Sequence, residues 1–320
     1  MKKISLKKNV LIVGAGFMAN EYLKTLQILS VNYDLVGNRK KNVKNLEKKF
    51  KKTFYFGGIE NFKSEKFYSH CVICVNEDKI LKSIISVLNK GIKNILVEKP
   101  GGNSLKEIKK ITNISKKYKA KIFIAYNRRF YESIFQVHKI IKKDKGIISA
   151  DFSFTEWTDK IKKFNYKNEI YKKWFFFNSM HIIDLVFYLI GKPKELSSYS
   201  GYPLFPFKNS TFVGSGVSEK NIFFSYHSNW NSAGRWAINL YTRNKRIILS
   251  PLEKIYIQKK NSVNLKEIKF KKKFDHKYKP GLANLLIEFI FSRKKIILQS
   301  YPDYSKCFSI YEKIAKSLFK

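Results

Sequence analysis

The chain has 320 residues, and its 64 Lys and Arg residues against 24 Asp and Glu residues give a formal net charge of +40. Hydrophobic residues make up 44% and aromatic residues 16%, which excludes a disordered polycation and is enough to build a core. A nucleic-acid binder usually gathers Arg-rich charge in one patch. Here nearly all basic residues are Lys, and both halves of the chain share the surplus. We therefore interpret the charge as a solvated surface and expect no specific nucleic acid partner.

The three cysteines, Cys71, Cys74 and Cys307, are an odd number and predict no disulfide framework. Cys71 and Cys74 lie in an apolar run typical of a buried strand, where residues three apart face opposite sides, so we expect neither a redox pair nor a metal site. The apolar run after the basic N-terminus is too short for a signal peptide. Polar residues interrupt the longest apolar stretch, 174–190, so we predict a cytoplasmic protein without a membrane span.

The first 126 residues alternate short apolar runs with longer amphipathic segments. We predict strands at 9–13, 33–37, 53–56, 70–75, 94–97 and 121–126, and helices at 18–29, 41–50, 79–90 and 105–118. Strands that alternate with helices at this spacing are typical of the α/β class with a doubly wound parallel sheet. We assign residues 1–126 to a first domain of this kind.

The pattern changes after about residue 127. We predict helices at 131–141, 282–291 and 305–319, and strands at 147–157, 211–217, 221–228, 236–242, 245–249 and 254–258. Strands clustered without intervening helices predict a mostly antiparallel open sheet with one face available for binding. We assign 127–320 to a second α/β domain for substrate binding and oligomerisation, whose last helix is a candidate to pack against the first domain.

A glycine-rich turn follows the first predicted strand. The segment 14–19 reads Gly-Ala-Gly-Phe-Met-Ala and leads directly into a helix. Gly14 allows the tight turn, Gly16 lets the backbone approach a pyrophosphate, and the small Ala19 lets the helix pack closely on the strand. The free N–H groups at the start of the helix complement phosphate charge. The turn therefore predicts a dinucleotide site, which makes the first domain a Rossmann domain.

The end of the second strand distinguishes the two nicotinamide cofactors. An NAD site usually places a carboxylate there to bind the ribose 2′-hydroxyl, whereas an NADP site uses Arg for the 2′-phosphate. The sequence here is Gly37-Asn38-Arg39 followed by two lysines, without a carboxylate. This favours NADP(H), with NAD(H) as the alternative because lysines are frequent throughout the chain.

Four motifs in the same order resemble those of the glucose-fructose oxidoreductase and inositol dehydrogenase family (Gfo/Idh/MocA). They are the glycine-rich turn, Glu98-Lys99-Pro100 after the fifth strand, the stretch 126–130, and His181 with Asp184 three residues later. The resemblance covers essentially the whole chain. It implies a second-domain sheet that lies over the nicotinamide and forms homodimers or homotetramers.

The resemblance also implies roles for individual residues. Lys99 is the lysine that contacts the nicotinamide ribose and the substrate hydroxyl in relatives, and His181 is the histidine that acts there as acid or base. A hydride transfer at a carbinol carbon requires a proton to move on its oxygen, which suits an imidazole. The expected cofactor-binding residues are Gly14, Gly16, Phe17, Met18, Ala19, Asn38, Arg39, Asn76, Glu98 and Lys99.

One position departs from the family pattern. Many members carry Asp four residues before the histidine, and this chain has Phe177 there. Loss of that carboxylate removes a group that would orient the imidazole and stabilise its charged form. Either Lys99 and His181 suffice, or another group such as Asp184 or the substrate contributes, or the chemistry has changed. Without the motif, a histidine on an apolar helix would be interpreted as a core residue.

The remaining substrate-site candidates come from the second part of the chain. They are Tyr126, Asn127, Arg129, Asn178, Asp184, Trp230 and Arg235. We predict an NAD(P)-dependent oxidoreductase acting on the CH–OH group of a sugar, sugar acid or nucleotide-linked sugar. The lysine-rich composition and the Asn-Ser-x-His stretch at 178–181 resemble those of family members in bacterial surface-polysaccharide or nonulosonate biosynthesis, which implies a role of that kind. The alternative prediction is a non-catalytic dinucleotide-binding sensor or assembly protein of the same fold.

Overall fold

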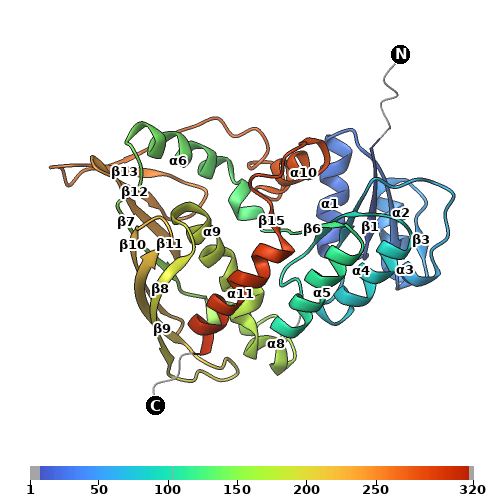
Figure 1. Cartoon of the computed structure of the whole chain (residues 1–320), viewed down its shortest axis with the longest axis horizontal. Coiled ribbons are helices and arrows are strands. Elements are labelled where there is room, and N and C mark those ends of the chain that lie inside the picture. Colours follow the sequence, from blue (N-terminus) through green and yellow to red (C-terminus); the bar gives the residue numbers. More distant parts are fainter. Residues whose placement is uncertain (1–7, 103, 317–320) are drawn as a thin grey trace. The chain divides into compact units, whose positions relative to one another are not determined.

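The computed structural model describes residues 8–102 and 104–316, which form two compact units (Figure 1). The first unit contains the chain up to Asn127 together with 274–306, and the second contains 128–273 and the residues from Cys307 onward. The sequence assigned all of 127–320 to the second domain, so residues 274–306 differ from that expectation. They join the first unit because β15 (Gln299–Ser300) pairs with its sheet and α10 (Leu282–Phe291) packs against α1 (Phe17–Ile28).

The first unit is built on a seven-stranded sheet in the order β15-β6-β5-β4-β1-β2-β3. Its parallel strands are β1 (Asn9–Val13), β2 (Asn32–Gly37), β3 (Tyr55–Phe56), β4 (His70–Ile73), β5 (Asn94–Val97) and β6 (Lys121–Ile124). Only β15 runs antiparallel to its neighbour. The central strands are apolar along their length because helices cover both faces, which confirms the predicted doubly wound sheet.

The helices of this unit are amphipathic and follow the strands in alternation. They are α2 (Lys40–Phe50), α3 (Gly58–Asn61), the 3-10 turn η1 (Glu77–Lys79), α4 (Ile80–Asn89) and α5 (Leu105–Lys117), in addition to α1 and α10. Helix α4 packs against α3 and α5. Strand order reverses beside β1, and such a switch point is where open α/β sheets bind ligands at the carboxyl ends of their strands.

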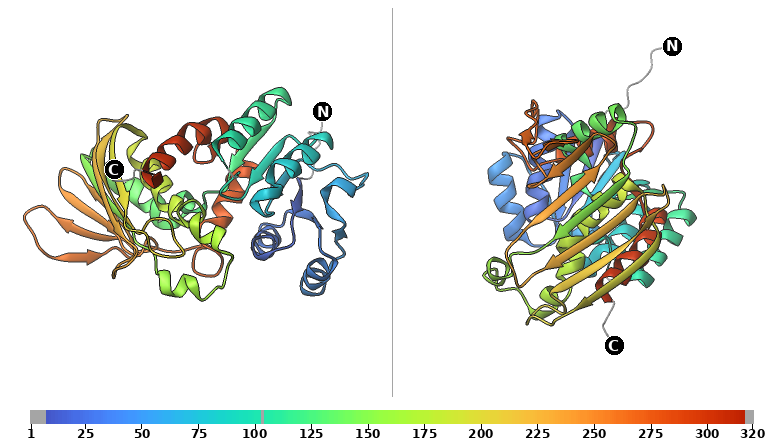
Figure 2. Two further views of the ribbon diagram at one scale, coloured as in Figure 1. Left: turned by 90° about the horizontal axis from the view of Figure 1, so that it is seen from below. Right: turned by 90° about the vertical axis from the view of Figure 1, so that its left-hand side faces the viewer.

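The second unit contains an eight-stranded sheet in the order β14-β13-β12-β11-β7-β10-β9-β8 (Figure 2). The strands are β7 (Ser149–Phe154), β8 (Pro193–Gly201), β9 (Thr211–Ser218), β10 (Phe223–Asn229), β11 (Trp236–Tyr241), β12 (Lys245–Leu249), β13 (Tyr256–Lys259) and β14 (Leu265–Glu267). Only the β7–β10 pair is parallel. The predicted mostly antiparallel sheet is confirmed, with β8 and β14 as additions that the sequence did not indicate.

Helices cover one face of this sheet. They are α6 (Glu132–Lys143), α7 (Thr158–Lys162), α8 (Asn168–Lys172), the π-helix η3 (Phe175–Ser179) and α9 (Met180–Ile190), with the later part of α11 (Tyr301–Lys316). The ring of Phe187 on α9 lies 6.2 Å from that of Phe152 and 5.6 Å from that of Phe224. Alternate residues of β7 are buried, as expected for a strand with one face against the core. The final residues of the helix predicted at 305–319, namely 317–319, lie outside the described part of the chain.

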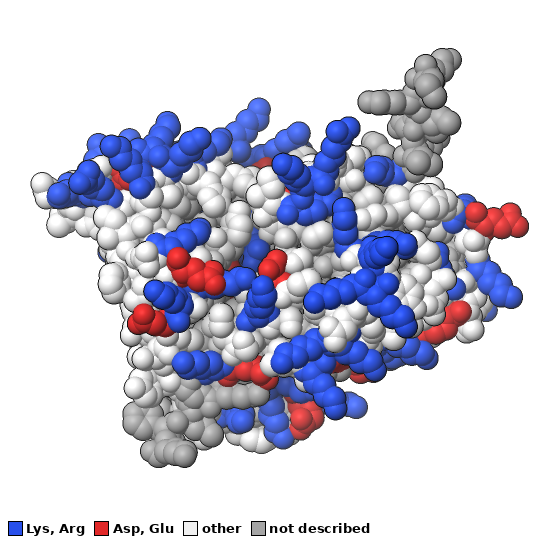
Figure 3. Space-filling model, viewed as in Figure 1, with Lys and Arg blue, Asp and Glu red and all other residues white. Residues whose placement is uncertain are grey.

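Lysine and arginine side chains are spread over the visible face of the molecule and do not gather in one patch (Figure 3). Most of these long side chains keep their charged ends in water, where they are separated and screened. Among the described residues, no helix is both long enough and apolar enough to span a membrane.

Candidate functional site

The glycine-rich turn after β1 has the geometry that its sequence predicted. Gly14 has φ +119°, and a Cβ atom there would lie 2.4 Å from the backbone oxygen of Cys74, so no other residue fits. Gly16 differs because no atom lies within 4 Å of the position its Cβ would take. The backbone therefore borders open space at the start of α1, where free N–H groups and the helix dipole favour phosphate.

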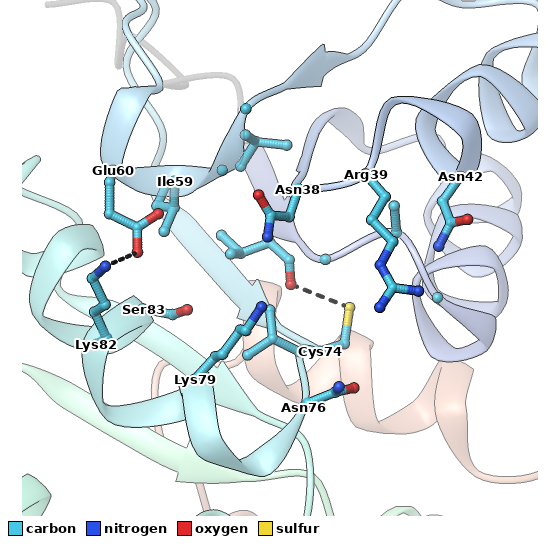
Figure 4. Close-up of a pocket in the computed structure, with 18 of the residues that line it drawn as sticks. Asn38, Arg39, Asn42, Ile59, Glu60, Cys74, Asn76, Lys79, Lys82 and Ser83 are labelled. Carbon is cyan, nitrogen blue, oxygen red and sulfur yellow. Dashed lines mark hydrogen bonds and ion pairs between the residues drawn. The ribbon is translucent and has the colours of Figure 1, made fainter.

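A cavity of about 600 Å³ lies in front of this turn, at the carboxyl ends of β1, β2 and β4 (Figure 4). Its volume falls in the usual range for small-molecule sites. Of the residues predicted to bind the cofactor, those that line it are Gly14, Gly16, Asn38, Arg39 and Asn76. Phe17 is 70% exposed at the start of α1, Ala19 is buried against the strands, and Met18, Glu98 and Lys99 also lie outside the lining.

The end of β2 carries a cation and an amide in place of a carboxylate. Asn38 and Arg39 are both exposed, and Arg39 precedes the first turn of α2. Asp34 lies on the same strand but is buried, where it accepts hydrogen bonds from Tyr68 at 2.9 Å and Lys66 at 3.2 Å. Asp34 is thus engaged away from the cavity, whereas Arg39, just after β2, lines it.

One carboxylate does reach the cavity, from an element that sequence reasoning did not consider. Glu60 on α3 forms an ion pair with Lys82 on α4 at 3.5 Å, and Figure 4 shows the two facing each other across from Arg39. A Cβ on Gly58 would lie 2.9 Å from Glu60 Oε2 and 3.6 Å from Asn38 Oδ1, so both oxygens border the same space. The available signal was the position of Glu60 just after the third predicted strand.

The Glu98-Lys99 segment follows β5, at the same carboxyl edge of the sheet. Glu98 is buried and accepts a hydrogen bond from Tyr22 on α1 at 2.7 Å. Burial raises the pKa of Glu98, and this effect exceeds the opposing effects of the Tyr22 bond, Lys99 and Lys279. Lys99 is half-buried beside it.

Two buried tyrosines of α11 hold the backbone after Lys99. Tyr301 donates a hydrogen bond to the carbonyl of Gly101 at 2.5 Å, and Tyr304 donates one to the carbonyl of Pro100. These two anchors fix the turn that carries Lys99. The sequence offered no signal for them, because they come from about 200 residues further along the chain.

In the second unit, Glu156 is the centre of a buried network. It lies just beyond β7 and is 1% exposed. Its carboxylate accepts hydrogen bonds from Asn178 at 3.0 Å, Ser179 at 2.7 Å, Arg235 at 2.9 Å and the Trp236 indole at 3.3 Å. Burial raises its pKa, opposed by Arg235 and by the hydrogen bonds. Asn178 and Arg235 were predicted site residues, and Glu156 is the group that brings them together.

His181 lies directly after this network. Phe175–Ser179 form a π-helix that continues into α9, and π-bulges are frequent at functional sites. His181 is buried in the first turn of α9, and Asn178 and Ser179 on the preceding turn are bound to Glu156. A carboxylate is therefore present near the start of this helix although Phe177 stands at the aspartate position. The sequence signal for Glu156 was a charged residue at the end of a predicted strand.

The other candidates have packing contacts of their own. Arg129 and Asp184 form a bidentate ion pair with distances of 2.7 and 2.6 Å, and Tyr311 donates to Asp184 at 3.2 Å. Burial alone would lower the pKa of Arg129, but the Asp184 carboxylate outweighs it and raises that pKa. Trp230 is buried and donates to the carbonyl of Phe154.

Two further candidates, Tyr126 and Asn127, belong to the first unit. Tyr126 is buried with its ring 6.0 Å from that of Tyr304, and Asn127 donates to the carbonyl of Pro280 at 2.9 Å. Cys71, Cys74 and Cys307 form no disulfide. Within the described residues, no group of His, Cys, Asp and Glu side chains is arranged to hold a metal ion.

The glycine turn, the cavity at the strand ends and the strand order define a dinucleotide-binding Rossmann domain. Residues 8–126 match the GFO_IDH_MocA family, an oxidoreductase family with an NAD-binding Rossmann fold. This match confirms the resemblance stated from the motifs over the first part of the chain, which is similar to that family. No protein of curated function matches the sequence significantly.

The whole described fold is shared with solved structures. An oxidoreductase from Agrobacterium radiobacter in complex with NAD+, L-tartaric acid and magnesium has a TM-score of 0.81 at 13% identity, covering 97% of this chain and 96% of that one. The UDP-N-acetylglucosamine 3-dehydrogenase GnnA from Acidithiobacillus ferrooxidans has a TM-score of 0.77 at 8% identity, covering 97% of each chain. A super-repressor mutant of Gal80p from Saccharomyces cerevisiae has a TM-score of 0.74 at 12% identity, covering 97% and 95%.

Proposed function

We propose that the protein is an NADP(H)-preferring oxidoreductase that transfers a hydride to or from a carbinol or carbonyl carbon of a sugar, sugar acid or nucleotide-linked sugar. The observation that carries this proposal is the cavity in front of the Gly14–Gly16 turn, with Arg39 at the end of β2. Open space at the Gly16 Cβ position fits a pyrophosphate that lies against the backbone. Arg39 supports NADP(H) because a guanidinium matches a phosphate bidentately.

The chain's own residues would serve the reaction as follows. A bound nicotinamide would supply or accept the hydride. The Lys99 ammonium would stabilise negative charge developing on the substrate oxygen, and His181 would exchange the proton of that oxygen. Glu156 would act as a positioning residue, because it fixes Asn178 and Ser179 in the turn that precedes His181.

The similarity of fold to a UDP-N-acetylglucosamine dehydrogenase supports a nucleotide-linked sugar as one substrate class. We also propose a role in bacterial surface-polysaccharide or nonulosonate biosynthesis, which the resemblance of the sequence supports. The second candidate function, a non-catalytic dinucleotide-binding protein, is favoured by Phe177 at the aspartate position and by the similarity to a repressor mutant.

The decisive experiment follows nicotinamide absorbance with a panel of sugars, sugar acids and nucleotide-linked sugars. We expect turnover that falls by about 10²–10³-fold in Lys99→Ala, the usual cost of losing one preorganised charge-stabilising group. The matched control is Lys109→Ala on the exposed face of α5, which leaves turnover unchanged. Tight NADPH binding without turnover would support the non-catalytic function, and equal turnover in Lys99→Ala and wild type would refute the catalytic proposal.

We also propose a homodimer or homotetramer formed through the outer face of the second-unit sheet. Large side chains are exposed there, with Tyr199 at 54%, Val213 at 41% and Phe223 at 66%. Exposed apolar groups on one surface favour an interaction site. Light scattering on wild type and on Val213→Asp tests this, since a charge in the interface should shift the population to monomer.

A further inference from the structure

Two arginines and a tryptophan meet at one edge of the second-unit sheet. Trp236 begins β11 and pairs with Phe154 at the end of β7, so Arg235 lies beside Glu156. Arg128 reaches the same place from the short turn that precedes α6, with its guanidinium 4.5 Å from the centre of the Trp236 ring. The same edge carries the Glu156 network that leads to His181.

The two guanidinium groups make few hydrogen bonds. Arg235 donates one, from Nη1 to Glu156, and stacks 4.7 Å from Trp157 and 4.9 Å from Trp236. Among the described residues, no oxygen accepts a hydrogen bond from the Arg128 side chain, whose contact is the face of Trp236. Each guanidinium has five N–H donors in a fixed plane. Most donors of the pair are therefore available to a ligand, and the indoles fix the planes that hold them.

In the part of the chain that the structure describes, no carboxylate accepts hydrogen bonds from the remaining N–H donors of Arg128 and Arg235. Glu156 already accepts hydrogen bonds from four different side chains, so its oxygens are saturated. Glu253 acts on Arg128 at long range without forming an ion pair. Desolvation by burial lowers the pKa of Arg128, which means that its positive charge is held there at a cost in free energy. Arg128 is half-buried, and no carboxylate of the described residues forms an ion pair with it, so an anion from outside the chain would compensate this charge.

We propose that Arg128 and Arg235 form a subsite for an anionic group, a carboxylate or a phosphate, carried by the substrate. This rests on the proposed function and narrows its substrate class to sugars that bear such a group near the reacting carbon. A carboxylate or phosphate presents two oxygens in a plane, and a guanidinium binds them through two parallel N–H bonds. The indole faces of Trp157 and Trp236 replace part of the hydration of the two cations.

The test uses phosphate and malonate as separate probes, with chloride at equal ionic strength and mannitol as the neutral control. Binding is followed by tryptophan fluorescence, because Trp157 and Trp236 contact the arginines. We expect saturable binding of at least one anion, weakened at least tenfold in Arg128→Met and in Arg235→Met. Arg246→Met is the matched control, since Arg246 stacks on Tyr241 elsewhere on the sheet. The tighter probe identifies the group as carboxylate or phosphate.

A second measurement uses the wild-type chain and does not depend on the variants folding. Phenylglyoxal modifies accessible arginines, and mass spectrometry after limited reaction locates the modified residues. The bound anion should protect Arg128 and Arg235 and leave Arg246 reactive. Equal anion affinity in all three variants, or equal protection of all arginines, would overturn the proposal. Either result would mean that the anions bind through the general positive charge of the surface and not at Arg128 and Arg235. NADPH affinity, measured on the same samples, separates this failure from failure of the proposed oxidoreductase function.

Discussion

The two units hold their charged residues in opposite ways. In the first unit, the charged residues that line the cavity are exposed, and Arg39 directly follows the end of β2. In the second unit, Glu156 and Asp184 are 1% exposed and are paired by residues that lie far away in the chain. A buried charge costs several kcal/mol of folding free energy unless it is paired. The buried charges of the second unit therefore require their partners for stability, whereas the exposed charges around the cavity do not.

This difference separates stability from specificity. Substitution of a buried paired charge should damage the fold, whereas substitution of an exposed cavity charge should change ligand preference and leave stability within about 0.5 kcal/mol.

The largest effect is expected at the Arg129–Asp184 pair. Arg129→Met leaves a buried carboxylate without its partner and should lower the free energy of unfolding by about 3–5 kcal/mol. Urea unfolding followed by circular dichroism measures this. The double variant Arg129→Met with Asp184→Leu removes both charges and should recover most of the loss. A single variant as stable as wild type would mean that the pair is not a structural element of the fold.

His70 is a buried titratable group of the first unit, like Asp34 and Glu98, and it gives a pH signature. Burial, with smaller contributions from Lys8 and Lys295, lowers its pKa to about 4, against an ordinary value of 6.5. The unfolded chain therefore takes up this proton first. The stability contribution is complete above about pH 6.5 and is lost as the pH falls towards 4, by about 3 kcal/mol at 1.36 kcal/mol per unit.

His70→Gln should flatten the unfolding free energy between pH 4 and 6.5. The same substitution at His227, which is exposed on β10, provides the control and should leave the profile as in wild type. A wild-type profile that is already flat over this range would show that His70 is protonated in the folded state at little cost in free energy.

The difference between locally positioned residues and residues paired over long sequence distances also explains what could be predicted from the sequence. The glycine turn, Asn38 and Arg39 follow strands whose period and boundaries are local properties, so their convergence at one sheet edge was predictable. Glu156 was missed because Arg235 becomes its neighbour only when β7 pairs with β11, and Asn178 only when η3 lies beside the end of β7. Strand pairing depends on tertiary packing, which no local pattern encodes.

The segment 274–306 was misplaced for a related reason. Its helix α10 was predicted at the correct residues, but its return to the first unit depends on pairing of β15 with β6. A two-residue strand has no periodicity to detect. Tyr301 and Tyr304 anchor the turn after Lys99, and they could not be recognised because their position also depends on the return of this segment to the first unit.

Arg39→Met should weaken NADPH binding by about 10–100-fold, because a charge-assisted hydrogen bond contributes about 1.5–3 kcal/mol. NADH has no 2′-phosphate, and its affinity should change by less than about twofold. Fluorescence titration of both cofactors measures the two values. The unfolding free energy should stay unchanged, because Arg39 is exposed. Equal loss of both cofactors would place Arg39 against the shared part of the dinucleotide and remove the basis for an NADP(H) preference.

The smallest effect is expected at Glu60, and it should have the opposite sign. Its carboxylate borders the same space as Asn38, and its ion pair with Lys82 is long and largely exposed. Such a pair is worth less than about 1 kcal/mol, so Lys82 can turn from Glu60 to a phosphate at little cost. Glu60→Gln removes the repulsion towards a 2′-phosphate and weakens an acceptor for a 2′-hydroxyl. The substitution should therefore strengthen NADPH binding and weaken NADH binding, each by about threefold in affinity.

Lys82→Met should shift the two affinities in the reverse direction. Glu77→Gln on η1, whose side chain lies outside the cavity lining, controls for the general loss of one negative charge. If Glu77→Gln tightened NADPH as much as Glu60→Gln did, the effect would belong to the net charge of the protein. If Glu60→Gln but not Glu77→Gln shifts the two cofactor affinities, the Glu60 carboxylate of α3 contributes to binding of the ribose 2′-hydroxyl. In NAD-binding Rossmann domains a carboxylate at the end of β2 binds that hydroxyl, and Glu60 would do so more weakly. The ratio of the two affinities would then depend on the balance between Arg39 and Glu60 across a single cavity.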